Sequence, residues 1–230
     1  MPYPLVVFDA YGTLLDVYSI RVLAEQLYPG HGAQIAALWR EKQVEYTRLV
    51  TLADTTPDGS RYYRDFWELT RLALRYTLRR YELPESVVHE EALMNQYAKL
   101  QPHPENLEVL QELKQRGVAT AVLSNGNAEM LCAGLANAGF TPLIDAVLSA
   151  DTLRQYKIRP AVYALALQRF PQWQARDVLF VSSNAWDALG ATWFGFDTLW
   201  IDRKGLPPET LGPPPRHMGT DLRAVLGVVS

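Results

Sequence analysis

Residues 5–13 read LVVFDAYGT, an apolar run followed at once by an aspartate and a turn. Four consecutive apolar residues without polar alternation predict a strand that is buried on both faces, as in a parallel sheet. The run stops at Asp9, and Gly12 marks the turn. A charged residue at the carboxyl end of such a strand lies where open α/β sheets bind ligands. This stretch therefore predicts an α/β fold with Asp9 at its ligand-binding edge.

The second half of the chain repeats this combination of short apolar run and helix. Further strands are predicted over residues 118–123, 145–149, 178–181 and 198–201, with 198–201 as the last strand. Helices are predicted around residues 107–113, 128–138, 160–170 and 185–194, three of them ended by a glycine. Regular alternation of strands and helices predicts a doubly wound parallel sheet, a Rossmann-like core. The proline-rich residues 205–217 are expected to form an irregular surface segment.

A long stretch between the first two strands follows a helical pattern instead. Apolar residues recur there at steps of three and four, first at Ile20, Leu23, Ala24 and Leu27, and again at Tyr62, Phe66, Leu69, Ala73 and Tyr76. A loop is predicted over residues 55–60, and Pro102-His103-Pro104 separates the stretch from the rest. We therefore expect two domains: residues 1–15 with 100–230 as the Rossmann-like core, and residues 16–99 as an inserted helical domain.

Composition excludes several classes of protein. The 230 residues are 48% hydrophobic, and 22 Lys and Arg stand against 25 Asp and Glu, a formal net charge of −3. Such a chain lacks the clustered positive charge that binding to nucleic acid requires. It also has no apolar run long enough for a membrane span, and its first residues do not resemble a signal peptide. Cys132 stands alone, which excludes an internal disulfide and a cysteine zinc cluster. We expect Cys132 to be buried and the protein to be cytoplasmic.

Polar residues gather at three of the predicted strand ends. They are Asp9, then Ser124 and Asn125, then Ser182, Ser183, Asn184 and Asp187. Lys157 lies in the connection between the second and third groups. Because the carboxyl ends of parallel strands open on the same edge, these residues are expected to converge on one crevice.

The order of these segments resembles the haloacid dehalogenase superfamily. The matching segments are FDAYGTL at 8–14, LSNG at 123–126, Lys157 with Pro160 and Tyr163, and FVSSNAWD at 180–187. Within the insert, WREKQVEY at 39–46 is similar to the cap helix of the L-2-haloacid dehalogenases. Each motif alone is weak, but the ordered set is specific. The resemblance covers nearly the whole chain and implies a Rossmann-like core with a helical cap over the crevice.

Two positions separate the dehalogenases from the phosphatases that fill most of this superfamily. A phosphatase needs a second carboxylate two residues after the nucleophile, where this chain has Tyr11. It also needs carboxylates in the last motif for Mg²⁺, a hard ion that prefers several oxygen ligands, whereas only Asp187 is present there. A departing halide needs neither a proton nor a metal. The resemblance therefore implies cleavage of L-2-haloacids such as 2-halopropionate or haloacetate, with no metal or cofactor.

The resemblance also implies a role for each residue of the crevice. Asp9 would attack the substrate Cα to form an aspartyl ester, and water would then attack the ester carbonyl, giving a 2-hydroxy acid of inverted configuration. Thr13 would bond to Asp9, and Lys157 would position Asp9 and keep it ionised. The remaining assignments are Ser182, Asn184 and Asp187 for activating the water; Ser124 and the backbone near Ala10 and Tyr11 for the substrate carboxylate; Arg40, Asn125 and Trp186 for the halide; and Tyr163 for supporting Lys157 beside the substrate. Family members are often homodimers, so the resemblance implies a homodimer here.

A purely structural role is open to most of these residues. Asp9 could be a helix N-cap or a turn residue, and Thr13 could cap a helix with Asp16 as its capping-box partner. Arg40 could form a surface ion pair with Glu41 or Glu45. The remaining structural interpretations are helix capping by Ser182, Asn184 and Asp187, a solvated surface position for Lys157, and core packing for Trp186 and Tyr163.

Two functional alternatives remain as well. One is a Mg²⁺-dependent phosphatase or phosphonate hydrolase on the same fold, and the second is a non-catalytic binding protein. The insert also offers aromatic candidates for lining the crevice, including Tyr46, Tyr62, Phe66 and Trp67.

Overall fold

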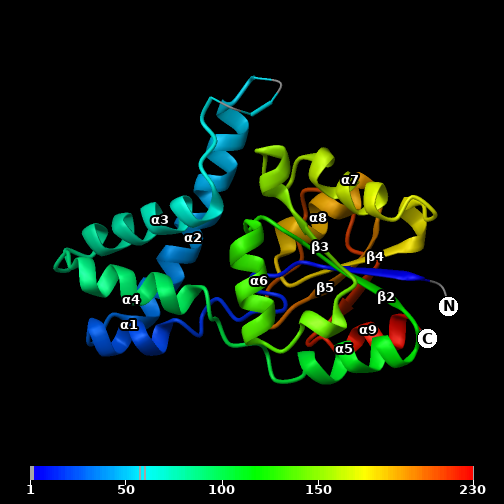
Figure 1. Cartoon of the computed structure of the whole chain (residues 1–230), viewed down its shortest axis with the longest axis horizontal. Helices are drawn as coiled ribbons and strands as arrows, with labels where there is room; N and C mark the ends of the chain where they lie inside the picture. Colours follow the sequence, from blue (N-terminus) through cyan, green and yellow to red (C-terminus); the bar gives the residue numbers. More distant parts are fainter. Residues whose placement is uncertain (1–2, 57, 60, 230) are drawn as a thin grey trace.

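Six strands form a single parallel sheet in the computed structural model, which describes residues 3–56, 58–59 and 61–229 (Figure 1). Pro57 and Ser60 of the expected loop, and Met1 and Pro2, lie outside these ranges. The strands are β1 (Leu5–Phe8), β2 (Ala119–Ser124), β3 (Ala146–Ser149), β4 (Val178–Ser182), β5 (Asp197–Ile201) and β6 (His217–Gly219). Their order is β3-β2-β1-β4-β5-β6, and every neighbouring pair is parallel. The chain thus starts in the middle of the sheet and winds outward in both directions, which confirms the doubly wound fold.

Helices cover both faces of this sheet. They are α5 (Asn106–Gln115), α6 (Ala128–Asn137), α7 (Pro160–Arg169), α8 (Ala185–Phe194) and α9 (Ala224–Val228). Helices α7 and α8 pack together on one face, whereas α5 and α9 pack together on the other (Figure 1). All four residues of β1 are buried, as expected for a central strand between two helical layers.

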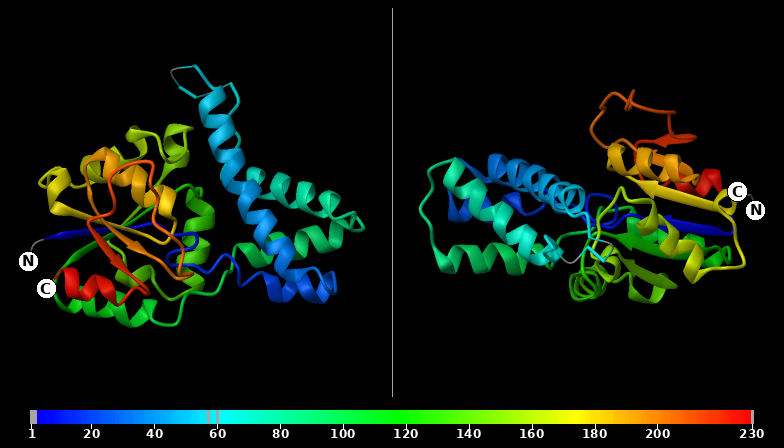
Figure 2. Two further views of the ribbon diagram at one scale, coloured as in Figure 1. Left: turned by 180° about the vertical axis from the view of Figure 1, so that it is seen from behind. Right: turned by 90° about the horizontal axis from the view of Figure 1, so that it is seen from above.

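Four further helices stand to one side of the sheet, and we call them the cap (Figures 1 and 2). They are α1 (Arg21–Leu27), α2 (Gly32–Ala53), α3 (Phe66–Arg80) and α4 (Val87–Tyr97). Among the residues that the structure describes, no helix is long and apolar enough to cross a membrane. The cap joins the core through two adjacent segments, where the amide of Asp16 donates to the carbonyl of Gln101 over 2.8 Å. We propose domain boundaries at 15/16 and 99/100, beside this double crossing.

The third cap helix begins later than the apolar spacing predicts. Asp65 caps α3 because its carboxylate accepts a 2.7 Å hydrogen bond from the amide of Glu68. Tyr62 therefore lies in the preceding loop, exposed, and including it in the helix was wrong. Tyr76 is in the helix but is also exposed, whereas Phe66, Leu69 and Ala73 are buried as expected.

Two further expectations about the core part were wrong. The strand predicted at 198–201, which is β5, is not the last one, because β6 follows the proline-rich segment. Strand β6 pairs with β5 from Leu199–His217 to Ile201–Gly219. This strand has three residues, of which His217 and Gly219 are half-buried and Met218 is exposed, so it contains no buried apolar run that would predict it. Cys132 is exposed, since it lies on the outer face of α6 while Leu131 and Leu135 face the sheet.

Candidate active site

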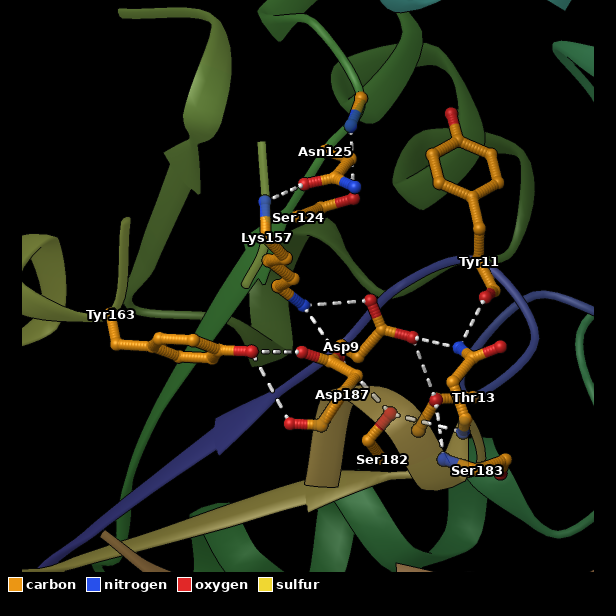
Figure 3. Close-up of polar contacts among 12 residues, drawn as sticks. Asp9, Tyr11, Thr13, Ser124, Asn125, Lys157, Tyr163, Ser182, Ser183 and Asp187 are labelled. Carbon is orange, nitrogen blue, oxygen red and sulfur yellow. Dashed lines mark hydrogen bonds and ion pairs between the residues drawn. The ribbon is translucent and has the colours of Figure 1, made fainter. Parts of the chain in front are cut away.

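The carboxyl ends of β1, β2 and β4 bring the predicted polar residues together (Figure 3). Strand β1 lies between the other two, with Phe8 level with Val122 on one side and Val181 on the other. The next residues along each strand, Asp9, Leu123-Ser124 and Ser182, therefore meet at one edge of the sheet. This is the edge at which doubly wound sheets bind ligands.

Asp9 is the centre of the cluster and is only 5% exposed. Its Oδ1 accepts a 2.9 Å hydrogen bond from Nζ of Lys157. Its Oδ2 accepts two more, from Oγ1 of Thr13 at 2.9 Å and from Nδ2 of Asn184 at 2.8 Å. The carboxylate is thus fixed by three donors from three segments, and no helix-capping contact of Asp9 is among its bonds. One lone pair of Oδ1 remains without a donor among the described residues.

Lys157 is a buried cation shared by two carboxylates. Its Nζ lies 2.9 Å from Asp9 Oδ1 and 2.8 Å from Asp187 Oδ2, and the side chain is 1% exposed. Burial on its own would lower the pKa of this ammonium, but the charges of Asp187 and Asp9 outweigh burial and raise the pKa. Lys157 is therefore charged, and the alternative of a solvated surface lysine is wrong.

Asp187 lies behind Lys157 without exposure to solvent. Burial raises the pKa of its carboxyl to about 6, Lys157 acts in the opposite direction, and the nearby charge of Asp9 raises the pKa further. Oδ1 accepts a 2.8 Å hydrogen bond from the hydroxyl of Tyr163, and Oδ2 accepts one of 3.1 Å from Ser182 Oγ. The support that Tyr163 gives to Lys157 thus runs through Asp187. A carboxyl that titrates near neutrality is suited to acting as a general base.

Helix capping by the first and last motifs is not what the structure shows. The hydroxyl of Thr13 donates to Asp9 and accepts a 2.9 Å hydrogen bond from the amide of Ser183, so it joins the two motifs instead of starting a helix. Asn184 occupies the N-cap position of α8, but its side chain makes no capping bond. It is turned to Asp9 and to the carbonyl of Tyr11, 3.1 Å away.

Arg40 reaches the site from α2 of the cap. Its Nη2 donates to the carbonyl of Tyr11 at 3.0 Å and to Oδ1 of Asn184 at 3.2 Å, and its Nη1 donates to Oε1 of Gln43 at 2.7 Å. The alternative of a surface ion pair is wrong, because Glu45 pairs with Lys42 instead. The guanidinium therefore bonds to the same Asn184 side chain that donates to Asp9, and Arg40 and Asp9 line one cavity.

The second strand contributes two predicted substrate-binding residues. Ser124 Oγ accepts a 3.1 Å hydrogen bond from the amide of Gly126, and Asn125 Oδ1 accepts one of 2.9 Å from the amide of Lys157. Ala10 lies in the turn after Asp9, where its carbonyl accepts from the amides of residues 13–15. Both strand-end turns are thus held by internal hydrogen bonds, which fixes the polar groups that they present.

A small cavity of about 10 Å³, room for about one water molecule, lies against Asp9. Its walls are Asp9, Tyr11, Arg40, Val44, Thr47, Phe66, Ser124, Asn125 and Trp186. The cavity is therefore lined by Asp9 and by the residues predicted to bind the substrate carboxylate and the halide, except Ala10. Tyr163, predicted to lie beside the substrate, does not line it. Trp186 is half-buried at this wall and does not belong to the core. Of the four aromatic candidates, Phe66 lines the cavity, whereas Tyr46 and Tyr62 line a separate groove on the cap.

Sequence reasoning missed the rest of the α2 face. Val44 and Thr47 lie one and two turns after Arg40 and complete the cavity wall. Arg48 follows, with its guanidinium 4.9 Å from the ring centre of Trp186 on the core. The helical spacing from Arg40 is the signal that could have found these residues.

The site lacks the group of carboxylate ligands that a magnesium site needs, among the residues that the structure describes. The described residues contain no group of three or more His, Cys, Asp and Glu side chains that could hold a metal ion. Between the Asp9 and Asp187 carboxylates stands Nζ of Lys157, within 2.9 Å of each. Tyr11 occupies the position of a phosphatase acid, but its ring stacks on Tyr97 and packs against Phe66, and burial raises its pKa far above neutrality.

Comparison with known proteins identifies close relatives over the whole chain. A family model described as haloacid dehalogenase-like hydrolase matches residues 3–195. An (S)-2-haloacid dehalogenase of Pseudomonas sp. (strain YL) is 41% identical over 221 residues, which cover 96% of this chain and 92% of that protein.

Solved structures agree with this match. The crystal structure of the L-2-haloacid dehalogenase RSc1362 superposes with a TM-score of 0.94 and 48% identity, covering 100% of this chain and 99% of that one. The L-2-haloacid dehalogenase of Xanthobacter autotrophicus with chloropropionic acid covalently bound has a TM-score of 0.88 and 35% identity, covering 99% and 98%.

Proposed function

Because the chain belongs to the haloacid dehalogenase-like hydrolases, and within them to the L-2-haloacid dehalogenases, we propose that it hydrolyses short (S)-2-haloacids through an ester on Asp9. The enzyme is a hydrolase of carbon–halide bonds. The proposed substrates are 2-halopropionates and haloacetates, and the products are 2-hydroxy acids. The observation that carries the proposal is the Asp9 carboxylate, buried against the cavity and held by Lys157, Thr13 and Asn184.

In the first step, Oδ1 of Asp9 attacks the Cα of the substrate opposite the carbon–halogen bond. A bond forms between Oδ1 and Cα, and the halide leaves with the bonding electrons, so the configuration at Cα inverts. Oδ2 is occupied by two donors, whereas Oδ1 accepts only from Lys157 and keeps a lone pair for the attack. Burial strengthens the nucleophile because a carboxylate stripped of water reacts faster with an alkyl halide.

In the second step, water attacks Cγ of the aspartyl ester. The bond between Cγ and the ester oxygen breaks, so that oxygen leaves in the hydroxyl of the product while the water oxygen stays in Asp9. Asp187, with its pKa near 6, takes the proton of the water, and Ser182 and Tyr163 hold its carboxylate in place. Asp187 then returns this proton to the substrate oxygen as that oxygen leaves. The second proton of the water is released to solvent when the Asp9 carboxylate is restored, so halide is exchanged for hydroxyl with release of one proton.

Two groups of cavity residues hold the anionic parts of the substrate. Ser124 and the backbone after Asp9, at Ala10 and Tyr11, bind the carboxylate. Arg40, Asn125 and Trp186 bind the departing halide, because a cation, an amide donor and a polarisable ring edge suit a large soft anion. All except Ala10 line the cavity.

We propose that this reaction needs no metal ion. Lys157 supplies the positive charge between the two carboxylates, and a halide leaves without protonation. The homodimer and the cytoplasmic location expected from the sequence stay predictions.

The test is halide release from (S)-2-chloropropionate and from its (R)-enantiomer, each with and without EDTA. We expect release from the (S)-enantiomer alone, at a rate that EDTA leaves unchanged. Loss of activity in EDTA would contradict the metal-free reaction. Release of phosphate from phosphomonoesters with Mg²⁺, and of no halide, would favour a phosphatase.

A further inference from the structure

Tyr156 precedes Lys157 in the chain, yet its side chain is packed against the cap. It is completely buried, and its hydroxyl donates a 2.6 Å hydrogen bond to the carbonyl of Arg64. Its ring stacks on Tyr63 at 5.7 Å between ring centres and lies 6.3 Å from that of Phe66, which lines the cavity. Burial raises the pKa of the Tyr156 hydroxyl, so it remains a donor.

The backbone beside Lys157 is also held from the cap. The amide of Tyr156 donates to Oγ1 of Thr51, in the last turn of α2, over 3.1 Å. The next amide, that of Lys157, is bonded to the core instead of the cap, because it donates to Oδ1 of Asn125. The hydroxyl of Tyr63 adds another cap–core bond, to the carboxylate of Asp151. The segment that carries Lys157 is thus clamped between the two parts of the molecule.

From these contacts we propose that Tyr156 is a positioning residue, which places Lys157 on the two carboxylates when the cap is seated on the core. The inference rests on the proposed function, since it concerns the lysine of that reaction. It assigns to the cap a second task beside closing the cavity, namely completing the charge arrangement around Asp9.

The size of the cavity explains why such coupling matters. A volume of about 10 Å³ holds about one water molecule, so even a haloacetate cannot enter without a movement of the cap. When the cap lifts, the bonds from Tyr156 to Arg64 and Thr51 must break or pull the segment along. Lys157 can meet Asp9 and Asp187 together only after these bonds reform. Lys157 then positions the Asp9 carboxylate only after the substrate has been enclosed.

Replacement Tyr156→Phe tests the proposal because it removes only the hydroxyl. We expect kcat for (S)-2-chloropropionate to fall roughly five- to tenfold, the factor that one hydrogen bond of ordinary strength is worth. KM should change less than twofold, roughly, because the carboxylate and halide groups stay in place. Amide hydrogen exchange over residues 151–158 should rise, since the segment loses its attachment to the cap.

Tyr28→Phe is the matched control. The hydroxyl of Tyr28, also buried, donates to the carbonyl of Pro84 at 3.3 Å, entirely within the cap. The same atom is lost and the same kind of carbonyl is left without a donor. This variant should lose thermal stability but keep the wild-type kcat and the wild-type exchange over 151–158. A second variant, Thr51→Val, should lower kcat in the same direction as Tyr156→Phe.

The outcomes separate the inference from the function beneath it. If wild-type protein releases no halide, the proposed function fails. If wild type is active and Tyr156→Phe matches it in kcat, or loses no more than Tyr28→Phe, the positioning role of Tyr156 is overturned while the function stands. A fall in kcat with unchanged exchange over 151–158 would also contradict the proposed route through the Lys157 segment.

Discussion

The hydroxyl of Tyr163 donates a 2.8 Å hydrogen bond to Oδ1 of Asp187, while Lys157 and Ser182 both bond to the other oxygen. Both oxygens of this buried carboxylate are thus held by hydrogen bonds from named donors. The bond from Tyr163 acts to lower the pKa of Asp187, against the burial that raises it to about 6. Because the bond from Tyr163 lowers the pKa of Asp187, its loss should change how the reaction rate depends on pH.

We predict that the rate of ester hydrolysis rises with pH through about 6, as Asp187 becomes ionised and can take a proton from water. Replacement Tyr163→Phe removes a group that favours the ionised form, so the pKa of Asp187 should rise and the acid limb of the kcat profile should move to higher pH. Steady-state values of kcat measured from about pH 4 to about pH 9 check this movement of the acid limb. An acid limb that moves to lower pH in this variant would contradict the assignment of Asp187 as the base.

Replacement Lys157→Met should leave two buried carboxylates without their cation. Breaking a buried ion pair in this way costs about 3–5 kcal/mol of the free energy of unfolding. Without the ammonium the pKa of Asp187 rises further, so the loss should be larger at neutral pH than under acid conditions, where the carboxyl is protonated.

Denaturant unfolding of Lys157→Met at two pH values measures this loss, and Lys42→Met serves as the control. Lys42 pairs with Glu45 at the partly exposed surface of the cap, and removal of such a pair costs roughly 1 kcal/mol or less. Equal losses in the two variants would show that the Lys157 pair is not the buried centre described above.

Gly190 in α8 is predicted to accept no side chain. A Cβ at this position would lie 2.6 Å from the hydroxyl of Tyr163 and 2.5 Å from Cγ2 of Ile158, the residue after Lys157. Gly190→Ala should therefore displace both and lower kcat. Gly227→Ala is the control, because nothing lies within 4 Å of its Cβ. If both variants keep full activity in halide release, the close approach of α8 to Tyr163 is not needed for the site.

The strand ends could be predicted from the sequence because each buried run stops abruptly at a polar residue. Asp9, Ser124 and Ser182 were placed on one edge by that rule alone, and the structure brings them together. Contacts that cross between cap and core could not be predicted in the same way. The bond from Arg40 to Tyr11, and that from Tyr156 to Arg64, depend on how two packed parts meet, which no periodicity records.

Local patterns also failed where a short feature outweighed them. The apolar spacing predicted Tyr62 inside a helix. The Asp65 carboxylate, however, accepts from the amide of Glu68, so α3 begins after Asp65 and Tyr62 lies outside it. Strand β6 has too few apolar residues to be seen, and its position follows from pairing with β5. In both cases a hydrogen bond, which the apolar pattern does not encode, decided the structure.

Transfer of oxygen from water into Asp9 tests the central claim most directly. The enzyme is allowed many turnovers of (S)-2-chloropropionate in H₂¹⁸O, and the peptide that contains Asp9, released by trypsin at Arg21, is weighed by mass spectrometry. Asp9→Asn, which should release no halide, is carried through the same incubation as the control. We predict ¹⁸O in the Asp9 carboxylate of the wild type, because water attacks the ester at Cγ. Label in the lactate alone, with an unchanged Asp9 peptide, would show direct attack of water on Cα and contradict the aspartyl ester.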